Sequence, residues 1–433
     1  MKKKEILKTI IRESHTRPMP VYRPRCLSIP MDAGKIISII GARRSGKTYL
    51  MYQLMAQLMP ALDRTDMLMI NFEDERLELN ATELDLLLQG YQELYPDKDF
   101  SRCVFFFDEI QNVDGWERFV RRMYDSVSKN IVLTGSNAKL LSTDIASALR
   151  GRSISYTLYP LSFSEYLNFK QIIPDLYSPS SKASVYNALN VYLRHGGYPE
   201  LVNQEDDRLR QKILQEYFQV MIFRDLVERY RVTNVAALKF FLKRLFASAA
   251  NPVSIHRIYN DLKSAGIKAG KSALYDFMEM AENVFLVSTL AKYSPKVSVR
   301  ELGEKKVYVI DNGLLNAVVF RFSDDIGKAV EQAVFWEFKR REMDVYFTKN
   351  GYECDFIINE NDQVIGACQV CYDMSDVNTR KREIRALLKA CRQFNLKTGT
   401  IITWDADDEI TVDGILIRMV SLPQFLLSVG VEG

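Results

Sequence analysis

Short apolar runs that end in polar residues recur through the first part of the chain. Such runs lie within residues 35–48, 66–74, 103–113, 130–141 and 153–161. Apolar runs bounded by turn residues predict buried strands. Helix-period segments separate them; after residue 48, one helical face would carry Leu50, Met51, Leu54, Met55, Leu58, Met59 and Leu62. Alternating strands and helices predict an α/β fold built on a doubly wound parallel sheet.

The pattern changes further along the chain. Residues 162–235 read as charged, helix-period segments, and three shorter helices follow after residue 236. Residues 286–299 and 305–311 then read as two strands around a long basic connection, which is the order of a winged helix. The remaining residues predict a helix followed by strands at GYECDFIINE and QVIGACQVCY.

The composition of the chain indicates the class of protein. A chain of 433 residues with 47% apolar and 26% charged residues is typical of a globular protein with two or more domains. Six cysteines without a disulfide pattern favour a reducing compartment. Lys8 and Arg12 interrupt the apolar residues of the basic start, and no stretch of membrane-spanning length follows. We therefore expect a cytoplasmic protein with no membrane partner.

The segment KIISIIGARRSGKT contains a phosphate-loop pattern between a strand and a helix. Gly41 and Gly46 allow backbone N–H groups to surround a phosphate, and the next helix directs its dipole at the same charge. Lys47 would reach the β- and γ-phosphates of ATP, and Thr48 would ligate Mg²⁺. The two arginines of the loop should point towards solvent or a neighbouring element. The expected nucleotide-binding residues are Gly41, Ala42, Arg43, Arg44, Ser45, Gly46, Lys47, Thr48 and Tyr49.

Polar residues follow two further strands at the edge where an open α/β sheet binds its ligand. Asp108 fits the residue that holds Mg²⁺ through water, and Glu109 fits the base that polarises the attacking water. Ser136 and Asn137 end the next strand, where a polar side chain could orient the water or sense the γ-phosphate. A helix N-cap explains either residue equally simply.

Two arginines precede the last strand of this region, in LRGRS. Arg152, ahead of Arg150, could complete the active site of an adjacent subunit in a homo-oligomer, as arginine fingers do. A strand-edge cation in solvent is the alternative, and the sequence does not separate the two.

Together the motifs GARRSGKT, FFFDEIQNV, LTGSNAKLL, LRGRS, YPLSFSEY and HGGYPE resemble a family of prokaryotic AAA-type ATPases. The resemblance implies an ATPase core, a helical lid, a winged helix and a C-terminal domain of restriction-endonuclease-like fold. The corresponding ranges are 1–162, 163–235, 236–320 and 321–433. By similarity, the Gly197-Tyr198-Pro199 segment looks like a lid element whose Pro199 contacts nucleotide. A tight turn between helices is the alternative.

The winged-helix region raises the question of DNA. Its 12 basic and 7 acidic residues give a net charge of +5, which favours contact with phosphates. The basic set is Lys263, Lys268, Lys271, Lys292, Lys296, Arg300, Lys305 and Lys306. The third helix, however, carries Asp276, Glu279 and Glu282, which oppose insertion into a groove. Contact with DNA through the wing and use of the module to bind a protein both remain open.

The C-terminal region resembles an endonuclease core whose catalytic set is incomplete. Glu331 and Asp355 match its first two acids, but Gln369 and Cys371 stand where a carboxylate and a lysine belong. We expect Glu331 to lie at a distance from Asp355, with no ammonium at the site and no nuclease activity. Cys368 and Cys371 share the C-x-x-C spacing, but residues three apart in a strand face opposite sides, which argues against a zinc site.

Two functions are compatible with these motifs. The first is a Mg²⁺-dependent ATPase that acts as a switch or remodeller on an unidentified protein or other macromolecular partner. The second is an ATP-gated protein that binds or processes DNA through its nuclease-like end. The missing E-x-K motif and the acidic third helix favour the first.

Overall fold

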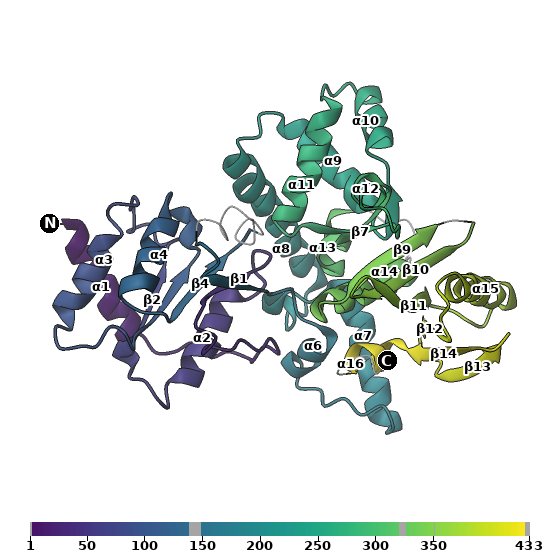
Figure 1. Cartoon of the computed structure of the whole chain (residues 1–433), viewed down its shortest axis with the longest axis horizontal. Helices are drawn as coiled ribbons and strands as arrows, with labels where there is room; N and C mark the ends of the chain where they lie inside the picture. Colours follow the sequence, from purple (N-terminus) through teal and green to yellow (C-terminus); the bar gives the residue numbers. More distant parts are fainter. Residues whose placement is uncertain (1, 138–148, 320–325, 350, 429–433) are drawn as a thin grey trace. The chain divides into compact units, whose positions relative to one another are not determined.

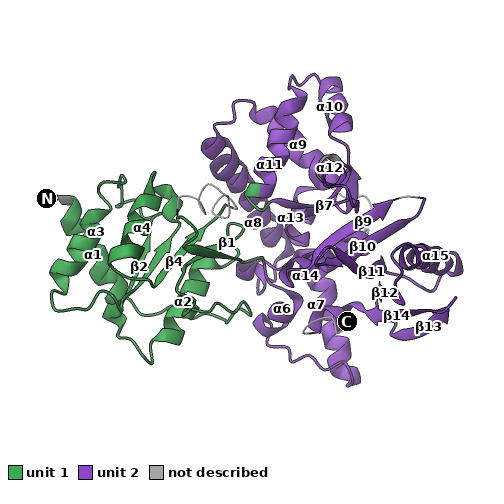
Figure 2. Ribbon diagram, viewed as in Figure 1, with its two compact units in different colours: residues 1–159, 283–285 green, residues 160–282, 286–433 purple. Residues whose placement is uncertain are grey.

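The computed structural model describes residues 2–137, 149–319, 326–349 and 351–428. The chain divides into two compact units, which are described separately. Unit 1 comprises residues 1–159 and 283–285, and unit 2 comprises residues 160–282 and 286–433 (Figure 2). Within the described residues, no helix combines the length and apolar character needed to cross a membrane.

Unit 1 is built on a five-stranded sheet (Figure 1). The strands are β1 (Ile36–Ile40), β2 (Met67–Asn71), β3 (Val104–Asp108), β4 (Ile131–Gly135) and β5 (Ser153–Thr157). Their order is β2-β3-β4-β1-β5, and every neighbouring pair is parallel. The helical elements are α1 (Lys2–Thr16), α2 (Lys47–Leu58), η1 (Arg64–Asp66), α3 (Asp85–Leu94), η2 (Ile110–Asn112) and α4 (Trp116–Ser126). The predicted parallel α/β sheet is confirmed.

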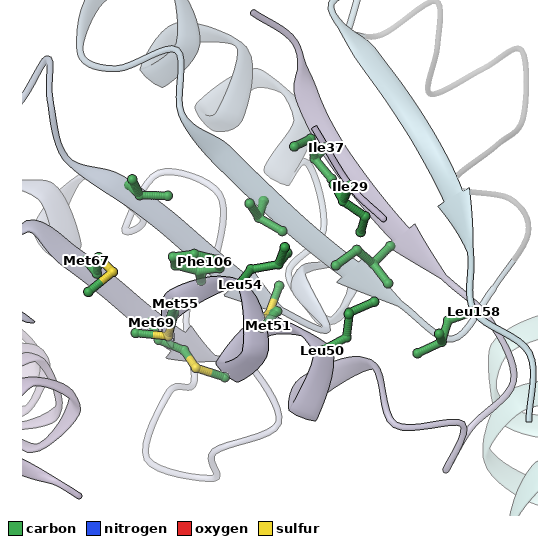
Figure 3. Packing of buried hydrophobic residues seen from close by; sticks show 13 residues of the cluster. Ile29, Ile37, Leu50, Met51, Leu54, Met55, Met67, Met69, Phe106 and Leu158 are labelled. Carbon is green, nitrogen blue, oxygen red and sulfur yellow. The ribbon is translucent and has the colours of Figure 1, made fainter. Parts of the chain in front are cut away.

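Helices cover both faces of this sheet. On one face, Leu54 of α2 packs in a buried cluster with Phe106 of β3 and Met67 of β2 (Figure 3). On the other face, Phe107 contacts Phe119 of α4, with 6.1 Å between ring centroids. Neighbouring residues of β3 therefore serve opposite layers, as strand alternation requires. Truncating a buried leucine such as Leu54 to alanine costs about 2–5 kcal/mol of unfolding free energy.

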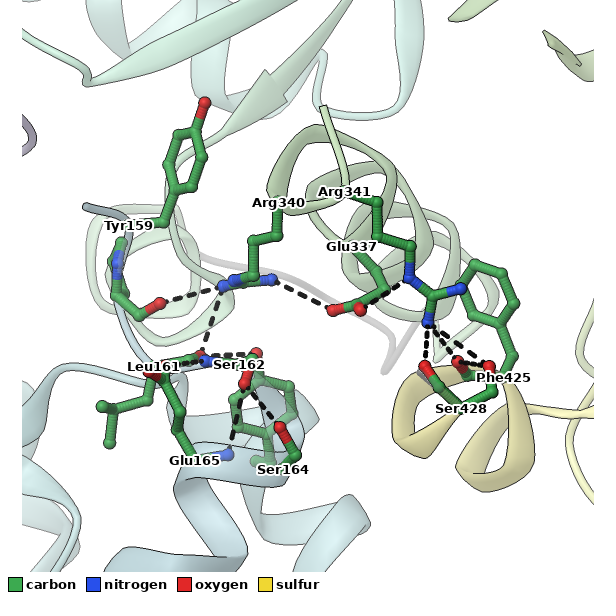
Figure 4. A network of polar contacts seen from close by, with 12 residues as sticks. Tyr159, Leu161, Ser162, Ser164, Glu165, Glu337, Arg340, Arg341, Phe425 and Ser428 are labelled. Atoms are coloured by element: carbon green, nitrogen blue, oxygen red, sulfur yellow. Dashed lines mark hydrogen bonds and ion pairs between the residues drawn. The ribbon is translucent and has the colours of Figure 1, made fainter. Parts of the chain in front are cut away.

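The first part of unit 2 is helical, as the sequence predicts. It contains α6 (Phe163–Phe169), α7 (Pro179–His195), η4 (Pro199–Leu201), α8 (Asp207–Val220) and the π-helical segment η5 (Met221–Glu228). Helix α6 begins at a capping box, in which the Ser162 hydroxyl accepts from the Glu165 N–H and the Glu165 carboxylate accepts from the Ser162 N–H (Figure 4).

Three helices and a small sheet come next. The elements are α9 (Val235–Ala247), β6 (Asn251–Val253), α10 (Ile255–Ser264), α11 (Lys271–Asn283), β7 (Val287–Ala291), α12 (Val297–Leu302) and β8 (Lys305–Val309). The antiparallel sheet has the order β6-β8-β7. The prediction of one strand over residues 286–299 is wrong, since β7 ends at Ala291 and α12 begins at Val297. Pro295 lies between them and has no N–H to donate to a sheet.

A six-stranded mixed sheet forms the end of the chain, in the order β13-β14-β12-β11-β10-β9. The strands are β9 (Asp344–Lys349), β10 (Glu353–Glu360), β11 (Gln363–Cys371), β12 (Thr398–Thr403), β13 (Asp408–Val412) and β14 (Ile415–Ser421). The helices are α13 (Asn312–Val318), α14 (Ile326–Arg340), α15 (Val377–Gln393) and α16 (Leu422–Leu427). The small sheet adjoins the large one, because the Tyr293 N–H donates to the Phe347 carbonyl at 2.8 Å.

Two arginines at the end of α14 connect separate parts of unit 2 (Figure 4). Arg341 donates to the Phe425 carbonyl in α16 at 2.6 Å and to the Glu337 carboxylate at 2.9 Å. Arg340 donates to the Leu161 carbonyl, just before α6, at 3.2 Å. Helix α14 therefore holds both the last helix of the chain and the start of the first helix of unit 2.

Candidate nucleotide-binding site

The phosphate loop connects β1 to α2, and two of its positions require glycine. A Cβ atom on Gly41 would lie 2.1 Å from the Leu158 carbonyl oxygen, and Gly46 has a φ of 99°. Arg25 supports the loop from outside by donating to the Ser45 carbonyl at 2.7 Å. Arg25 lies in no recognisable sequence pattern and was not predicted from the sequence.

Lys47 lies inside the loop, with its side chain only 5% exposed. Its ammonium group donates to the carbonyls of Gly41 at 3.1 Å and Ala42 at 3.2 Å, and it is 3.4 Å from the Glu109 carboxylate. The loop and the end of β3 are thus joined through one cation. Exchangeable carbonyl contacts of this kind leave the ammonium able to bind a phosphate.

Asp108, at the end of β3, is held by two hydroxyl groups. Thr48 donates to one carboxylate oxygen at 2.8 Å, and Thr134 of β4 donates to the other at 2.5 Å. Burial, with the nearby charge of Glu109, raises the pKa of Asp108 to about 6. A hydroxyl and a carboxylate side by side form the oxygen-only donor set that Mg²⁺ prefers, so the residues fit this ion. Thr134 was missed because a threonine in a strand usually reflects strand propensity.

Glu109 adopts a left-handed backbone conformation, with a φ of 53°, directly after the strand. Its N–H donates to the Thr134 hydroxyl at 2.9 Å, and its carboxylate accepts from the Ser136 N–H at 3.2 Å and from Gln111. Burial opposes ionisation, but Lys47 and the Gln111 hydrogen bond outweigh it and lower the pKa of Glu109. The carboxylate is therefore ionised at neutral pH and can accept a proton.

The remaining loop residues lie around Lys47, Asp108 and Glu109. Arg43 forms an ion pair with Glu73 at 3.0 Å, Arg44 is exposed, and the half-exposed Tyr49 packs edge-on against a neighbouring tyrosine. Asn137 is buried at the end of the described segment that follows β4. Most of the LTGSNAKLL motif beyond it, residues 138–141, lies outside the described residues.

Arg152 lies just before β5 in the same unit. Its guanidinium forms an ion pair with Asp125 at 2.9 Å, and its backbone carbonyl accepts from the Ile36 N–H at 2.8 Å. Arg150, two residues earlier, has a φ of 52°. The Asp125 ion pair accounts for Arg152 within one chain, and a role in an adjacent subunit stays a prediction.

Pro199 belongs to unit 2, at the start of η4. The Gly197 N–H before it donates to the buried Asp311 carboxylate at 2.6 Å, and Tyr198 is buried. These contacts explain the HGGYPE turn by packing within unit 2. The contact of Pro199 with nucleotide stays a prediction.

The C-terminal acids are arranged differently from the expectation. Lys306 of β8 lies 3.1 Å from Glu331 and 3.0 Å from Asp355 through the same ammonium group. The expectation that Glu331 lies apart, with no ammonium at the site, is wrong because the lysine comes from another part of the sequence. Counting Lys306 among the DNA-facing cations is also wrong, since its side chain is 1% exposed.

The other two positions of the expected nuclease motif have local partners. Gln369 donates to Glu383 of α15 at 2.6 Å and accepts from the Asp355 N–H at 3.2 Å. Cys371 lies in an apolar cluster with Leu387, and burial raises the pKa of its thiol to about 11. The strand predicted for this segment is confirmed as β11.

Comparisons with known proteins agree with the fold of unit 1. Residues 33–167 match the model of an AAA domain family, and residues 186–325 match a domain of unknown function. An uncharacterized protein of Methanocaldococcus jannaschii is 37% identical over 401 residues, which cover 90% of this chain and 87% of the relative. An uncharacterized protein of Haemophilus influenzae is 29% identical over 386 residues, which cover 89% of this chain and 92% of the relative.

Among solved structures, Cdc6p from Pyrobaculum aerophilum is similar over 66% of this chain and 86% of its own, at 14% identity. Its TM-score of 0.25 is too low to support an argument about function. The relative in M. jannaschii is decisive, because its similarity is high and extends over nearly the whole length. The chain therefore belongs to the same family as that protein, and its residues 33–167 form an AAA domain.

Proposed function

We propose that this protein binds and hydrolyses ATP with Mg²⁺ and acts as a nucleotide-driven switch or remodeller on a macromolecular partner. The observation that carries the proposal is the convergence of the phosphate loop with the ends of β3 and β4. Lys47 joins the loop to Glu109, while Thr48 and Thr134 both donate to Asp108. A structural ion pair alone would not need these hydroxyl donors beside a buried acid doublet.

Each side chain has a distinct role in this proposal. Thr48 and Asp108 would hold Mg²⁺, which when bound neutralises phosphate charge. Lys47 would bind the β- and γ-phosphates, and the backbone N–H groups of the loop would surround the β-phosphate. Glu109 would accept the proton of the attacking water, since its carboxylate is ionised.

The same contacts support a switch. Glu109 holds both the ammonium of Lys47 and the N–H of Ser136, at the end of β4. A phosphate that draws Lys47 away from Glu109 changes the charge that holds this part of the backbone. The nucleotide state would thereby reach Ser136 and Asn137, the described residues that follow β4.

Two variants test the proposal. Lys47→Ala should abolish or severely weaken Mg²⁺-dependent ATP binding in calorimetry, because phosphate charge is left unmatched. Glu109→Gln should bind ATP but lose turnover, since an amide cannot take up a proton. Lys35→Ala, an exposed lysine just before β1, is the matched control and should behave as wild type. Hydrolysis at the wild-type rate by Glu109→Gln would contradict the assigned roles.

A second candidate function is ATP-gated DNA binding or processing, favoured by exposed lysines on the turn between α10 and α11. Lys263 and Lys268 flank this turn, next to a surface hollow that also includes Tyr259. Against it, Asp276 and Glu279 of α11 are exposed. Gel mobility shifts with and without ATP, over a range of salt, test this function. This function would be established if Lys263→Ala and Lys268→Ala bind DNA more weakly than the wild-type protein and with a smaller salt dependence.

A further inference from the structure

A buried lysine surrounded by acids lies in unit 2. The ammonium of Lys306 lies 3.1 Å from a Glu331 oxygen, 3.0 Å from a Glu353 oxygen and 3.0 Å from an Asp355 oxygen. The lysine side chain is 1% exposed. Burying a charge is costly unless close partners compensate it. This lysine therefore serves a purpose that a surface lysine could not.

The surrounding residues fix two of the acids, Glu331 and Asp355, in place. The Tyr308 hydroxyl donates to Glu331 at 2.7 Å, and its ring stacks on Phe335 with 3.9 Å between centroids. The second oxygen of Asp355 accepts from the Val370 N–H of the neighbouring strand at 3.1 Å. Both carboxylates are thus oriented towards the ammonium by groups that cannot easily move.

The charges do not balance around one ammonium. Three carboxylates face a single positive charge, and burial together with Asp355 raises the pKa of Glu331 to about 7. Burial opposes the charge of Lys306, but Asp355 and the two glutamates outweigh it and raise its pKa. Several carboxylate oxygens around one point form the chemistry that hard divalent cations prefer. Here the ammonium takes that position.

The lysine and the acids come from three different elements. Lys306 belongs to β8, the central strand of the small sheet, whereas Glu353 and Asp355 belong to β10 and Glu331 to α14. We infer that the three acids form an internal-cation site, that Lys306 is its resident cation, and that the lysine joins the two sheets while excluding divalent metal. Without the lysine, the same oxygens would bind a divalent cation such as Mn²⁺.

To bind a divalent cation, the three acids would have to move closer together. In the described part of the chain, no group of three His, Cys, Asp or Glu side chains has the geometry of a metal site. Ammonium contacts of about 3 Å are also longer than metal–oxygen bonds, which are about 2.0–2.6 Å. Removing the lysine side chain provides both the space and the uncompensated charge for this closure.

Thermal unfolding of the full chain tests the inference, with Lys305 of the same strand as the control. Lys306→Ala in EDTA should lower the Tm by about 5 °C or more, and Lys305→Ala by much less. Millimolar Mn²⁺ should restore part of the loss in Lys306→Ala. The restoration should disappear in Lys306→Ala with Asp355→Asn, which distinguishes this site from metal bound at Asp108.

Two results would overturn the inference. The first is equal Tm values for the Lys306→Ala and Lys305→Ala proteins. The second is a Tm of the wild-type protein that rises with Mn²⁺ and loses this rise in Asp355→Asn, since metal would then displace the ammonium.

A measurement on the wild-type protein covers the case in which Lys306→Ala does not fold. Acetic anhydride labelling followed by peptide mass spectrometry should leave Lys306 unmodified in the native chain, while Lys305 reacts. Both lysines should react after denaturation. Labelling of Lys306 at the rate of Lys305 in the native protein would show that the ammonium is accessible and would refute the proposed site.

Discussion

Two buried lysines face carboxylates in the part of the chain that the structure describes, and they differ in how the ammonium is held. Lys47 follows a glycine-rich turn at the start of a helix, and its ammonium is shared between two backbone carbonyls and Glu109. Lys306 lies in the middle of a sheet, and its ammonium is shared among three carboxylates. The first set of contacts can be replaced by phosphate oxygens, whereas in the second set the protein's own carboxylates compensate the ammonium.

The comparison shows that residue types alone do not define a site. Each place combines a lysine with acids, and burial raises the pKa of one acid in each, Asp108 and Glu331. In unit 1 the hydroxyl groups of Thr48 and Thr134 donate to the Asp108 carboxylate. No cation of the protein itself is among these partners of Asp108, so the position beside it suits a ligand cation. In unit 2 the protein supplies the cation itself. We therefore expect ligand chemistry at the first place and structural stability from the second.

The largest expected effect is the loss of ATP binding or turnover on removal of one of the two lysines and not of the other. Lys47→Ala should lower ATP affinity or turnover by about 100-fold or more, because a preorganised charge on the phosphates is lost. Lys306→Ala should keep the KM for ATP within about twofold, since its contacts lie within unit 2. Steady-state ATPase assays of both variants measure this difference. A loss of ATP affinity in Lys306→Ala equal to that of Lys47→Ala would contradict the division of roles.

A smaller effect concerns assembly around the first site. If Arg152 completes the site of an adjacent subunit, specific ATPase activity should rise with protein concentration. Mixing inactive Arg152→Ala with inactive Glu109→Gln should then restore part of the rate, because some interfaces pair one intact half from each chain. Arg122→Ala, which removes another surface ion pair of unit 1, is the control. Turnover that is independent of concentration, with no rescue, would leave Arg152 as the partner of Asp125.

A third effect is on stability and depends on pH. The folded pKa of Asp108, about 6, lies above its ordinary value of 3.8, so ionising this carboxyl costs folding free energy. The cost is full above pH 6 and disappears as the pH falls towards 4. Asp108→Asn should therefore raise the free energy of unfolding of the nucleotide-free protein by about 3 kcal/mol at pH 7.

Urea unfolding at several pH values measures this difference between Asp108→Asn and wild type. The difference should be nearly constant above pH 6 and shrink between pH 6 and pH 4. A destabilised Asp108→Asn at pH 7 would show that the hydrogen bonds from Thr48 and Thr134 outweigh the cost of burying the charge.

The sequence predicted unit 1 better than unit 2 for a physical reason. The apolar runs and the phosphate loop are local patterns, so β1, β3 and the positions of Lys47 and Asp108 followed from short segments. Thr134 was missed because its partner Asp108 is 26 residues away and a strand threonine needs no special explanation. Arg25 was missed because only the folded chain brings it to the Ser45 carbonyl.

Unit 2 depends on contacts that no local pattern contains. Lys306 was counted with surface cations because lysines are usually exposed. Its partners Glu331 and Asp355 are 25 and 49 residues away, and their convergence depends on how β8 lies against β10. The C-x-x-C strand, the helix of Glu331 and the strand of Asp355 were predicted from sequence, but the convergence of the two acids on Lys306 was not.

The smallest expected effect is the absence of nuclease activity. Testing for this activity challenges the comparison of the two lysines most directly. We expect no Mg²⁺- or Mn²⁺-dependent nicking of supercoiled plasmid by the wild-type protein, with or without ATP. Lys306 already occupies the position between Asp355 and Glu331, and Gln369 supplies an amide that is hydrogen-bonded to Glu383. A divalent ion would have to displace a buried ammonium, and an amide stands at position 369 where the nuclease motif has a carboxylate. The assay compares wild type with Asp355→Ala under identical metal and ATP conditions, so that contaminating nuclease nicks both equally. Nicking that disappears in Asp355→Ala would mean that metal displaces Lys306 during turnover, and the second place would then be a ligand site like the first.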